Sequence, residues 1–289
     1  MNPTVAATVE ETRQAVAAAR RRGLSVGLVP TMGALHEGHA SLIRAARRQT
    51  GFVVVSIFVN PTQFGPHEDL TRYPRPLQQD LEVCGREGVD LVFHPEPATV
   101  YPPGFCTYVE VTGLQDVMEG AFRAGHFRGV ATVVLKLFNI VQPDVAFFGQ
   151  KDGQQVRIVR QMVADLDVPV EVRVCPTVRA ADGLALSSRN AYLDPEQRRG
   201  ATALHAALEL GRSLIEGGER DPERVRGAMA ARIGAAPGAV LDYAEVVAAD
   251  SLRRPDRLRG RVMLAVAVRF GSTRLIDNVL VDVPDTHSV

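Results

Sequence analysis

The stretch LSVGLVPTMGALHEGHASLIRAARRQT, residues 24–50, decides the fold of the chain. Its apolar run, residues 24–29, has the length of a buried β-strand, and Pro30 and Gly33 interrupt the pattern. From residue 39 onward, apolar side chains recur at helical spacing. We therefore predict a strand, a loop and a helix in succession, which is the repeating unit of a parallel α/β sheet.

Two histidines, His36 and His39, lie where this loop meets the predicted helix. Side chains three positions apart share one face of a helix, so both imidazoles can reach one ligand. The amino end of a helix that follows a strand favours anions, and imidazole can donate hydrogen bonds to phosphate near neutral pH. The pattern indicates a phosphate site. Two other interpretations stay open, namely histidines without a ligand role and two ligands of a metal ion.

Composition limits the class of protein. The chain has 289 residues, of which 46% are hydrophobic and 23% charged, enough for one large domain or two ordinary ones. Basic and acidic residues balance at 33 each, so net charge favours neither a nucleic-acid nor a membrane partner. No secretory signal and no apolar run of about 18 residues occur, which predicts a cytoplasmic protein. The three cysteines fit a reducing compartment, and we expect them to be buried and inert.

The remaining pattern predicts a Rossmann-like parallel sheet with helices on both faces, followed by a smaller α+β C-terminal domain. We place the domains at residues 1–177 and 178–289. In the first domain the other expected strands are residues 52–60, 89–95, 107–112, 145–150 and 170–178, and the expected helices are residues 10–22, 77–87, 129–141 and 151–166. In the second, the expected helices are residues 195–217 and 221–233, and the expected strands are residues 241–247, 261–270 and 273–282.

Polar residues also follow other predicted strands of the first domain. Residues 61–76 form a long loop rich in proline and polar groups, and long loops in compact domains are often functional. Lys151, Asp152 and Gln155 stand at a second junction between a strand and a helix. Because the carboxyl ends of parallel strands share one edge of the sheet, we expect these residues at the same edge as the histidines.

Five segments in this order resemble the pantothenate synthetase (pantoate–β-alanine ligase) family. They are PTMGALHEGH (residues 30–39), FVNPTQF (58–64), FFGQKDGQQ (147–155), LSSRN (186–190) and TRLIDN (273–278). Each motif is weak alone, but the match is colinear over nearly the whole chain. The resemblance implies an enzyme that activates pantoate with ATP to pantoyl adenylate and pyrophosphate. The amine of β-alanine then displaces AMP to give pantothenate.

The resemblance also implies roles for individual residues. His39 matches the family's proton donor, with His36 and Lys151 as the other catalytic candidates. The ATP-binding segments match Met32, Gly33, Ala34, Leu35, His36, Glu37, Gly38 and His39, then Gly149, Gln150, Lys151 and Asp152, and finally Val178, Leu186, Ser187, Ser188 and Arg189. Gln63 and Gln155 match pantoate contacts, and Asn60, just before the loop with Gln63, is a further substrate-binding candidate. Arg123 is a candidate for the β-alanine carboxylate. Asp80 resembles an acidic residue near a Mg²⁺–pyrophosphate site.

The family further implies a homodimer, and it often has Glu where this chain has Gln150 and Met where it has Leu186. Seen singly, each candidate is also an ordinary residue: the glutamines as solvated or capping side chains, Lys151 and Asp152 as first-turn charges, the serines as turn residues. Two rival functions remain open. One is a different H-x-x-H nucleotidyltransferase, and the other is a nucleotide-binding protein without catalysis. A zinc hydrolase fits less well because no third metal ligand with suitable spacing occurs.

Overall fold

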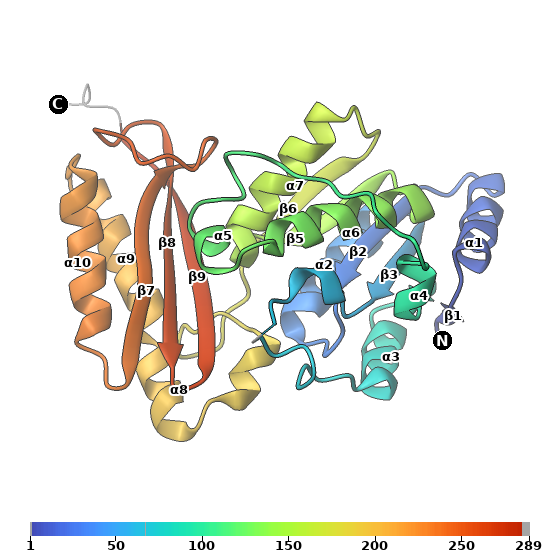
Figure 1. The fold of residues 1–289 in the computed structure, drawn as a ribbon, viewed down its shortest axis with the longest axis horizontal. Helices are drawn as coiled ribbons and strands as arrows, with labels where there is room; N and C mark the ends of the chain where they lie inside the picture. Colours follow the sequence, from blue (N-terminus) through green and yellow to red (C-terminus); the bar gives the residue numbers. More distant parts are fainter. Residues whose placement is uncertain (1, 67, 285–289) are drawn as a thin grey trace. The chain divides into compact units, whose positions relative to one another are not determined.

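The computed structural model describes residues 2–66 and 68–284, which form two compact units (Figure 1). The first unit comprises Met1–Asp116, Gly120–Gly149 and Gln155–Pro176. The second comprises Thr177–Val289 and also takes two short segments, Val117–Glu119 and Gln150–Gln154. The chain therefore passes between the units more than once before Pro176.

The first unit contains a six-stranded sheet in which every pair of neighbouring strands is parallel. Its spatial order is β1-β4-β3-β2-β5-β6. The strands are β1 (Thr4–Ala6), β2 (Val26–Thr31), β3 (Phe52–Ile57), β4 (Leu91–Phe93), β5 (Val145–Gly149) and β6 (Glu171–Cys175). The order reverses between β2 and β5, which is the position where open α/β sheets bind their ligands.

Helices cover both faces of this sheet, and its central strands β2, β3, β4 and β5 are largely buried. The helices are α1 (Val9–Arg21), α2 (Glu37–Gln49), α3 (Leu77–Arg86), α4 (Pro97–Val100), α6 (His126–Val141) and α7 (Gly153–Asp165), with the short α5 (Glu119–Phe122) before α6. Phe147 of β5 packs in the cluster formed with α2 and α3, whereas its neighbour Phe148 contacts Phe138 of α6. Successive strand residues point to opposite faces, so α6 lies on the face opposite α2 (Figure 1).

The predicted fold class is confirmed for this part of the chain, but two details were wrong. Residues 107–112 form no strand, because the N–H of Val109 donates to the Thr132 hydroxyl and the N–H of Val111 to the Gln115 side chain. Side chains thus satisfy backbone donors that a strand would pair with a neighbour. The three-residue β1, which pairs with β4, was missed because it is too short to show a periodic pattern.

The second unit combines a three-stranded antiparallel sheet with helices, as predicted. The strands are β7 (Ala239–Ala248), β8 (Arg261–Phe270) and β9 (Thr273–Asp282), and the helices are α8 (Pro195–Ala201), α9 (Ala203–Glu216) and α10 (Pro222–Gly234). The single helix expected over residues 195–217 is instead two, interrupted at Thr202. Asp194 begins α8 by accepting the backbone N–H groups of Glu196 and Gln197.

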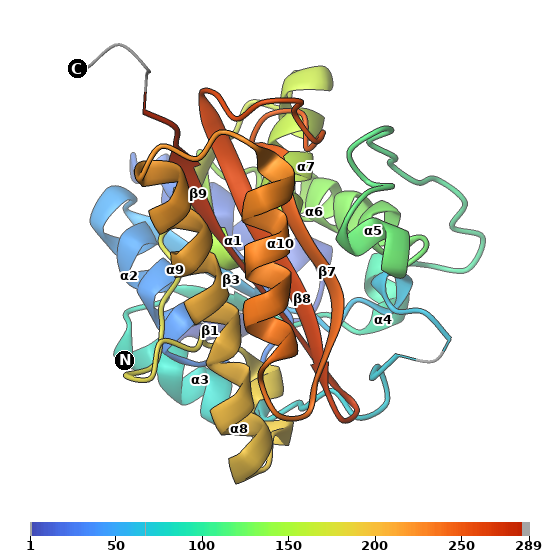
Figure 2. The ribbon, with the colours of Figure 1, turned by 90° about the vertical axis from the view of Figure 1, so that its left-hand side faces the viewer.

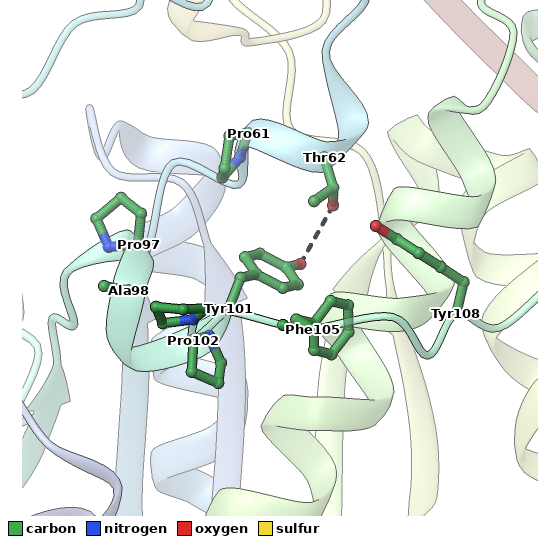
Figure 3. Close-up of a pocket in the computed structure, with 10 residues that line it drawn as sticks. Pro61, Thr62, Pro97, Ala98, Tyr101, Pro102, Phe105 and Tyr108 are labelled. Carbon is green, nitrogen blue, oxygen red and sulfur yellow. Dashed lines mark hydrogen bonds between the residues drawn. The ribbon is translucent and has the colours of Figure 1, made fainter.

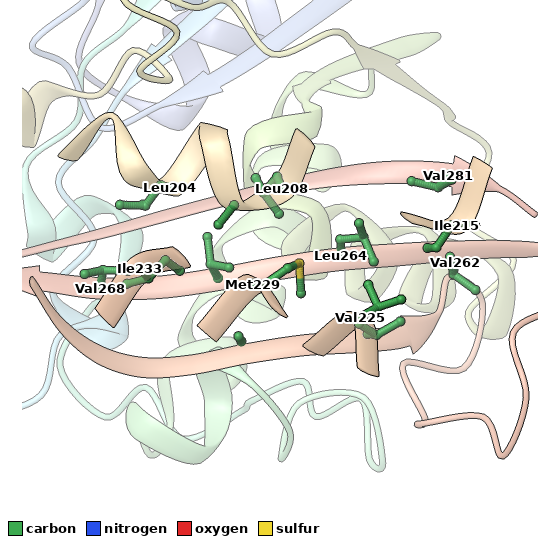
Figure 4. Close-up of a cluster of buried hydrophobic side chains, with 14 of the residues drawn as sticks. Leu204, Leu208, Ile215, Val225, Met229, Ile233, Val262, Leu264, Val268 and Val281 are labelled. Carbon is green, nitrogen blue, oxygen red and sulfur yellow. The ribbon is translucent and has the colours of Figure 1, made fainter. Parts of the chain in front are cut away.

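The core of the second unit lies between this sheet and the adjacent helices α9 and α10 (Figures 2 and 4). Alternate residues of β8 point into it, and they are fully buried. From the helices, Leu204, Leu208 and Ile215 of α9 and Met229 of α10 fill the space against them. In neither unit is any described helix long and apolar enough to cross a membrane.

The cysteines differ from the expectation in one case. Cys84 and Cys175 are buried, as expected, but Cys106 is exposed. Cys106 lies in an irregular segment directly before the residues that were expected to form a strand.

Candidate active site

The two predicted histidines form the amino end of α2 in the first unit. His36 is the N-cap, and its Nδ1 accepts the backbone N–H of Gly38 at 3.1 Å. The Nδ1 of His39 accepts the N–H of His36 at 3.3 Å, and the ring centroids are 4.2 Å apart. Because each Nδ1 is an acceptor, the proton of each neutral ring lies on Nε2. The structure thus orients two Nε2–H donors at a helix amino end, where an anion is favoured.

Asp80 of α3 holds the loop that leads to these histidines. Asp80 is 2% exposed, and its carboxylate accepts the backbone N–H of Ala34 at 2.9 Å and that of Leu35 at 2.7 Å. Ala34 has φ 51°, a left-handed conformation that costs free energy for a non-glycine residue. Burial raises the pKa of Asp80, although the two N–H donors and nearby His94 oppose the rise. The loop conformation therefore depends on a buried side chain from another helix.

Asn60 and Gln63 lie together at the carboxyl end of β3. Asn60 is 1% exposed, and its Nδ2 donates to Gln63 Oε1 at 2.9 Å and to the Gly129 carbonyl at 3.2 Å. The Tyr101 hydroxyl donates to Asn60 Oδ1 at 2.8 Å. Gln63 Nε2 in turn contacts Met32 Sδ at 3.3 Å. The predicted substrate residues Asn60 and Gln63 thus adjoin the predicted ATP segment that begins at Met32.

Arg123 contacts the same loop, but through acidic and backbone partners. Its guanidinium binds the Glu68 carboxylate through Nε at 2.8 Å and Nη2 at 2.5 Å, and Nη1 lies 3.1 Å from His126 Nε2. Nη2 also donates to the Gln63 carbonyl at 3.4 Å. The observed contacts attach the loop to the start of α6. Binding of the β-alanine carboxylate by Arg123 stays a prediction.

An apolar hollow with a volume of about 450 Å³ is lined in part by Tyr101 (Figure 3). Prolines and aromatic rings form its walls, and the Thr62 and Tyr101 hydroxyls meet within it at 3.2 Å. Its lining residues are Pro61, Thr62, Pro97, Ala98, Tyr101, Pro102, Pro103, Gly104, Phe105 and Tyr108. None of them is a predicted site residue, so this hollow is not the candidate site.

The second unit carries the segment with Lys151. Gly149 ends β5, and Gln150–Asp152 form a single 3₁₀ turn before α7, in which Gln155 is the third residue. Lys151 Nζ lies 3.4 Å from Asp152 Oδ1. The side chain of Asn278 on β9 donates to the carbonyls of both Gln150 and Lys151.

A hairpin in the second unit brings together the remaining ATP candidates. The N–H of Leu186 donates to the Val178 carbonyl at 3.0 Å, and the backbones of Arg179 and Ala185 form an isolated antiparallel β-bridge. Ser187 then caps the 3₁₀ turn Ser188–Tyr192 by accepting the N–H of Arg189. Val178, Leu186 and the serine–arginine turn are therefore one local structure.

Sequence reasoning gave no role to two residues that hold these segments. Asp277 and Asn278 lie within β9 and are 2% and 5% exposed. Their signal was present in the sequence: an adjacent acid and amide interrupt an apolar strand, and such buried polar groups require partners. The described residues contain no group of three or more His, Cys, Asp or Glu side chains arranged to hold a metal ion.

The parallel sheet and the paired histidines at the amino end of α2 define a Rossmann-like protein with a nucleotide- or phosphate-binding corner. More specifically, the chain belongs to the pantoate-beta-alanine ligase family, whose model matches residues 4–280. The predicted family is thereby confirmed.

Individual relatives agree with this assignment. Pantothenate synthetase of Moorella thermoacetica is 59% identical over 278 residues, covering 96% of this chain and 98% of that protein. The crystal structure of pantothenate synthetase from Thermus thermophilus superposes with a TM-score of 0.90 at 47% identity, covering 96% and 98% of the two chains. A pantoate-beta-alanine ligase from Francisella tularensis, solved in complex with beta-gamma ATP and beta-alanine, gives 0.78 at 35% identity, covering 96% and 97%.

Proposed function

We propose that this chain is an ATP-dependent ligase that joins pantoate to β-alanine. In the first step a pantoate carboxylate oxygen attacks the α-phosphorus of ATP, and pyrophosphate leaves. In the second step the amine of β-alanine attacks the acyl carbon. The bond from this carbon to the oxygen shared with the phosphate breaks, AMP leaves with that oxygen, and the nitrogen loses a proton. The product is pantothenate. Activation is needed because a carboxylate is a poor electrophile, whereas AMP is a good leaving group.

One observation within the first unit carries the proposal beyond family membership. The amide of Gln63, the predicted pantoate contact, lies 3.3 Å from Met32, the first residue of the predicted ATP segment. An acyl-adenylate reaction requires the acid and the α-phosphate to meet, so their binding residues must be neighbours. A neutral amide suits a hydroxy acid because it donates and accepts in one plane.

The histidines supply the donors that the first step needs. The α-phosphorus transition state spreads negative charge over its oxygens, and preorganised donors stabilise that charge. We propose that Nε2 of His36 and of His39 act in this way, with His39 as the proton donor. The ammonium of Lys151, the hydroxyls of Ser187 and Ser188, and the guanidinium of Arg189 would bind further phosphate oxygens.

We propose Mg²⁺ as the ion that accompanies ATP, where it would neutralise phosphate charge. The donor set of the described residues fits an ion held mainly by ATP and water, since no cluster of protein ligands is present. Asp80 stays a predicted contact, but both of its oxygens already accept N–H groups of the histidine loop.

The decisive assay supplies ATP, pantoate and β-alanine and measures pantothenate, AMP and pyrophosphate. We expect pyrophosphate release to require pantoate, and AMP release to require β-alanine as well. Omitting β-alanine and adding hydroxylamine should trap the activated acid as a hydroxamate. Transfer of AMP to a phosphate acceptor without pantoate would instead indicate a nucleotidyltransferase, and ATP binding without any product would indicate a protein that does not catalyse.

We also propose that the chain is cytoplasmic and that it forms a homodimer. Light scattering would test the dimer.

We further propose that residues 178–289 act as a lid that shields the adenylate from water. If they do, pantoyl adenylate should stay bound when β-alanine is withheld. Rapid release of AMP under that condition would contradict the lid.

A further inference from the structure

Asp277 and Asn278 are adjacent buried polar residues in the middle of β9. Their partners on β8 are apolar, since Asp277 pairs with Val266 and Asn278 with Ala265. A buried carboxylate and a buried amide both cost free energy unless they are hydrogen-bonded. The groups that satisfy them therefore indicate what this part of the strand does.

Asn278 uses both hydrogens of its amide on one segment. Nδ2 donates to the Lys151 carbonyl at 2.7 Å and to the Gln150 carbonyl at 2.9 Å, and Oδ1 accepts from Gln150 Nε2 at 2.8 Å. An amide suits this arrangement because it offers two donors and an acceptor in one plane. In a carboxylate of the same shape, an oxygen would replace Nδ2 and would face both carbonyl oxygens without a hydrogen to donate.

The neighbouring Asp277 braces this contact and holds the other ATP segment. Its carboxylate accepts the backbone N–H of Asn278 at 2.8 Å. It also accepts two hydrogen bonds from the Arg179 guanidinium, at 2.5 and 3.1 Å. Arg179 directly follows Val178 and also donates to the Gly183 carbonyl within the hairpin. Two successive residues of one strand thus fix both nucleotide segments of the second unit.

We propose that Asn278 is a positioning residue that aims the ammonium group of Lys151 at the phosphates of ATP. The proposal rests on the proposed function, because it assumes that Lys151 binds ATP. Asn278 acts by fixing the backbone from which the lysine side chain projects.

Close packing supports this role. A Cβ at Gly153 would come within 2.9 Å of Asn278 Oδ1 and 2.8 Å of Met263 Sδ, so glycine lets the segment lie directly on β8 and β9. Lysine reaches its ligand through a flexible four-carbon stem. Holding the carbonyls of Gln150 and Lys151 limits backbone motions that would displace the ammonium. A displacement of about 1 Å can lower the rate about 10²-fold.

A double-mutant cycle between Asn278→Asp and Lys151→Ala tests the proposal. In the wild-type background, Asn278→Asp should lower kcat/KM for ATP by about 10-fold or more and leave KM for β-alanine unchanged. In the Lys151→Ala background, the same change should cost less than about 2-fold, because its effect passes through the lysine. Equal losses in both backgrounds would overturn the proposal.

A matched control separates positioning from general stability. Val268→Ala removes a buried side chain from the core of the same sheet, and we expect it to lower the melting temperature without changing kcat/KM for ATP. If Asn278→Asp does not fold, Asn278→Ser keeps one donor and takes its place in the cycle. If the wild-type chain binds ATP but forms no pantothenate, the proposed function is wrong, but the positioning role of Asn278 can still be tested. The double-mutant cycle then compares ATP dissociation constants measured by calorimetry.

Discussion

Asp80 Oδ1 accepts the backbone N–H of Leu35 at 2.7 Å, so a buried carboxylate on α3 holds the loop that precedes the paired histidines. Asp80→Asn replaces one acceptor oxygen with an NH₂ group that faces an N–H donor. We expect a loss of about 1–3 kcal/mol in the free energy of unfolding, measured by urea denaturation. We also expect weaker ATP binding, because the loop carries the candidate ATP residues.

The dependence on Mg²⁺ distinguishes the two roles of Asp80. If Asp80 only supports the loop, the Mg²⁺ concentration for half-maximal activity stays the same in Asp80→Asn. A large increase in that concentration with unchanged stability would indicate a direct contact with the ion instead.

Replacing His39 should abolish most turnover without unfolding the protein. We expect His39→Ala to lower kcat by about 10²–10⁴-fold, because it removes the proposed proton donor. His39→Asn is the matched variant, since its Oδ1 can still accept the His36 N–H that Nδ1 accepts now. An equal loss in both variants, with native circular dichroism, assigns the role to Nε2; near-normal adenylate formation in either would count against it.

Removing the charge of Glu68 should lower the free energy of unfolding at neutral pH. It should also make that free energy depend less on pH in the acid range. Burial raises the pKa of Glu68, but its hydrogen bonds and ion pair with Arg123, aided by His126, hold the pKa below 4.5. A lowered pKa contributes stability above about 4.5 that is lost as pH falls further. Glu68→Gln should therefore lose stability at pH 7 and less at pH 3, whereas Glu96→Gln, an exposed control, should change neither.

Two leucines of the sheet in the second unit should differ in the cost of truncation, because Leu264 is fully buried and Leu280 is partly exposed. Leu264→Ala removes a fully buried side chain of β8 from the core and should cost about 2–5 kcal/mol in chemical denaturation. Leu280→Ala on β9, where the side chain is 37% exposed, should cost less than about 1 kcal/mol. Similar losses would mean that the helices do not cover the face that contains Leu264.

Only Cys106 should react with a thiol reagent in the native state. Burial, with a smaller effect from Asp80, raises the pKa of Cys84 to about 12, and burial also raises the pKa of Cys175. The reactive species is the thiolate, so both buried thiols should stay unmodified until the protein unfolds. Cys106→Ser should abolish native labelling, and rapid labelling that persists in this variant would show that a buried cysteine becomes accessible.

The sequence by itself determined the fold class, because the hydrophobic periods of strands and helices are written in neighbouring residues. The run 24–29 became β2, and the alternating and continuous apolar segments near the end of the chain became the antiparallel sheet. Local pattern failed where distant side chains replaced strand partners, as Thr132 did for Val109 in the segment expected to be a strand.

Only the tertiary structure decided which residues hold the site in shape. The motifs placed His36, Lys151 and Gln63 in the chain, but not the supports that reach them from far away: Asp80 lies 45 residues from Leu35, and Asn278 lies 127 residues from Lys151. A periodic pattern reports which face of an element is buried. It does not report which buried carboxylate or amide meets which backbone group, because that pairing exists only after the elements have packed.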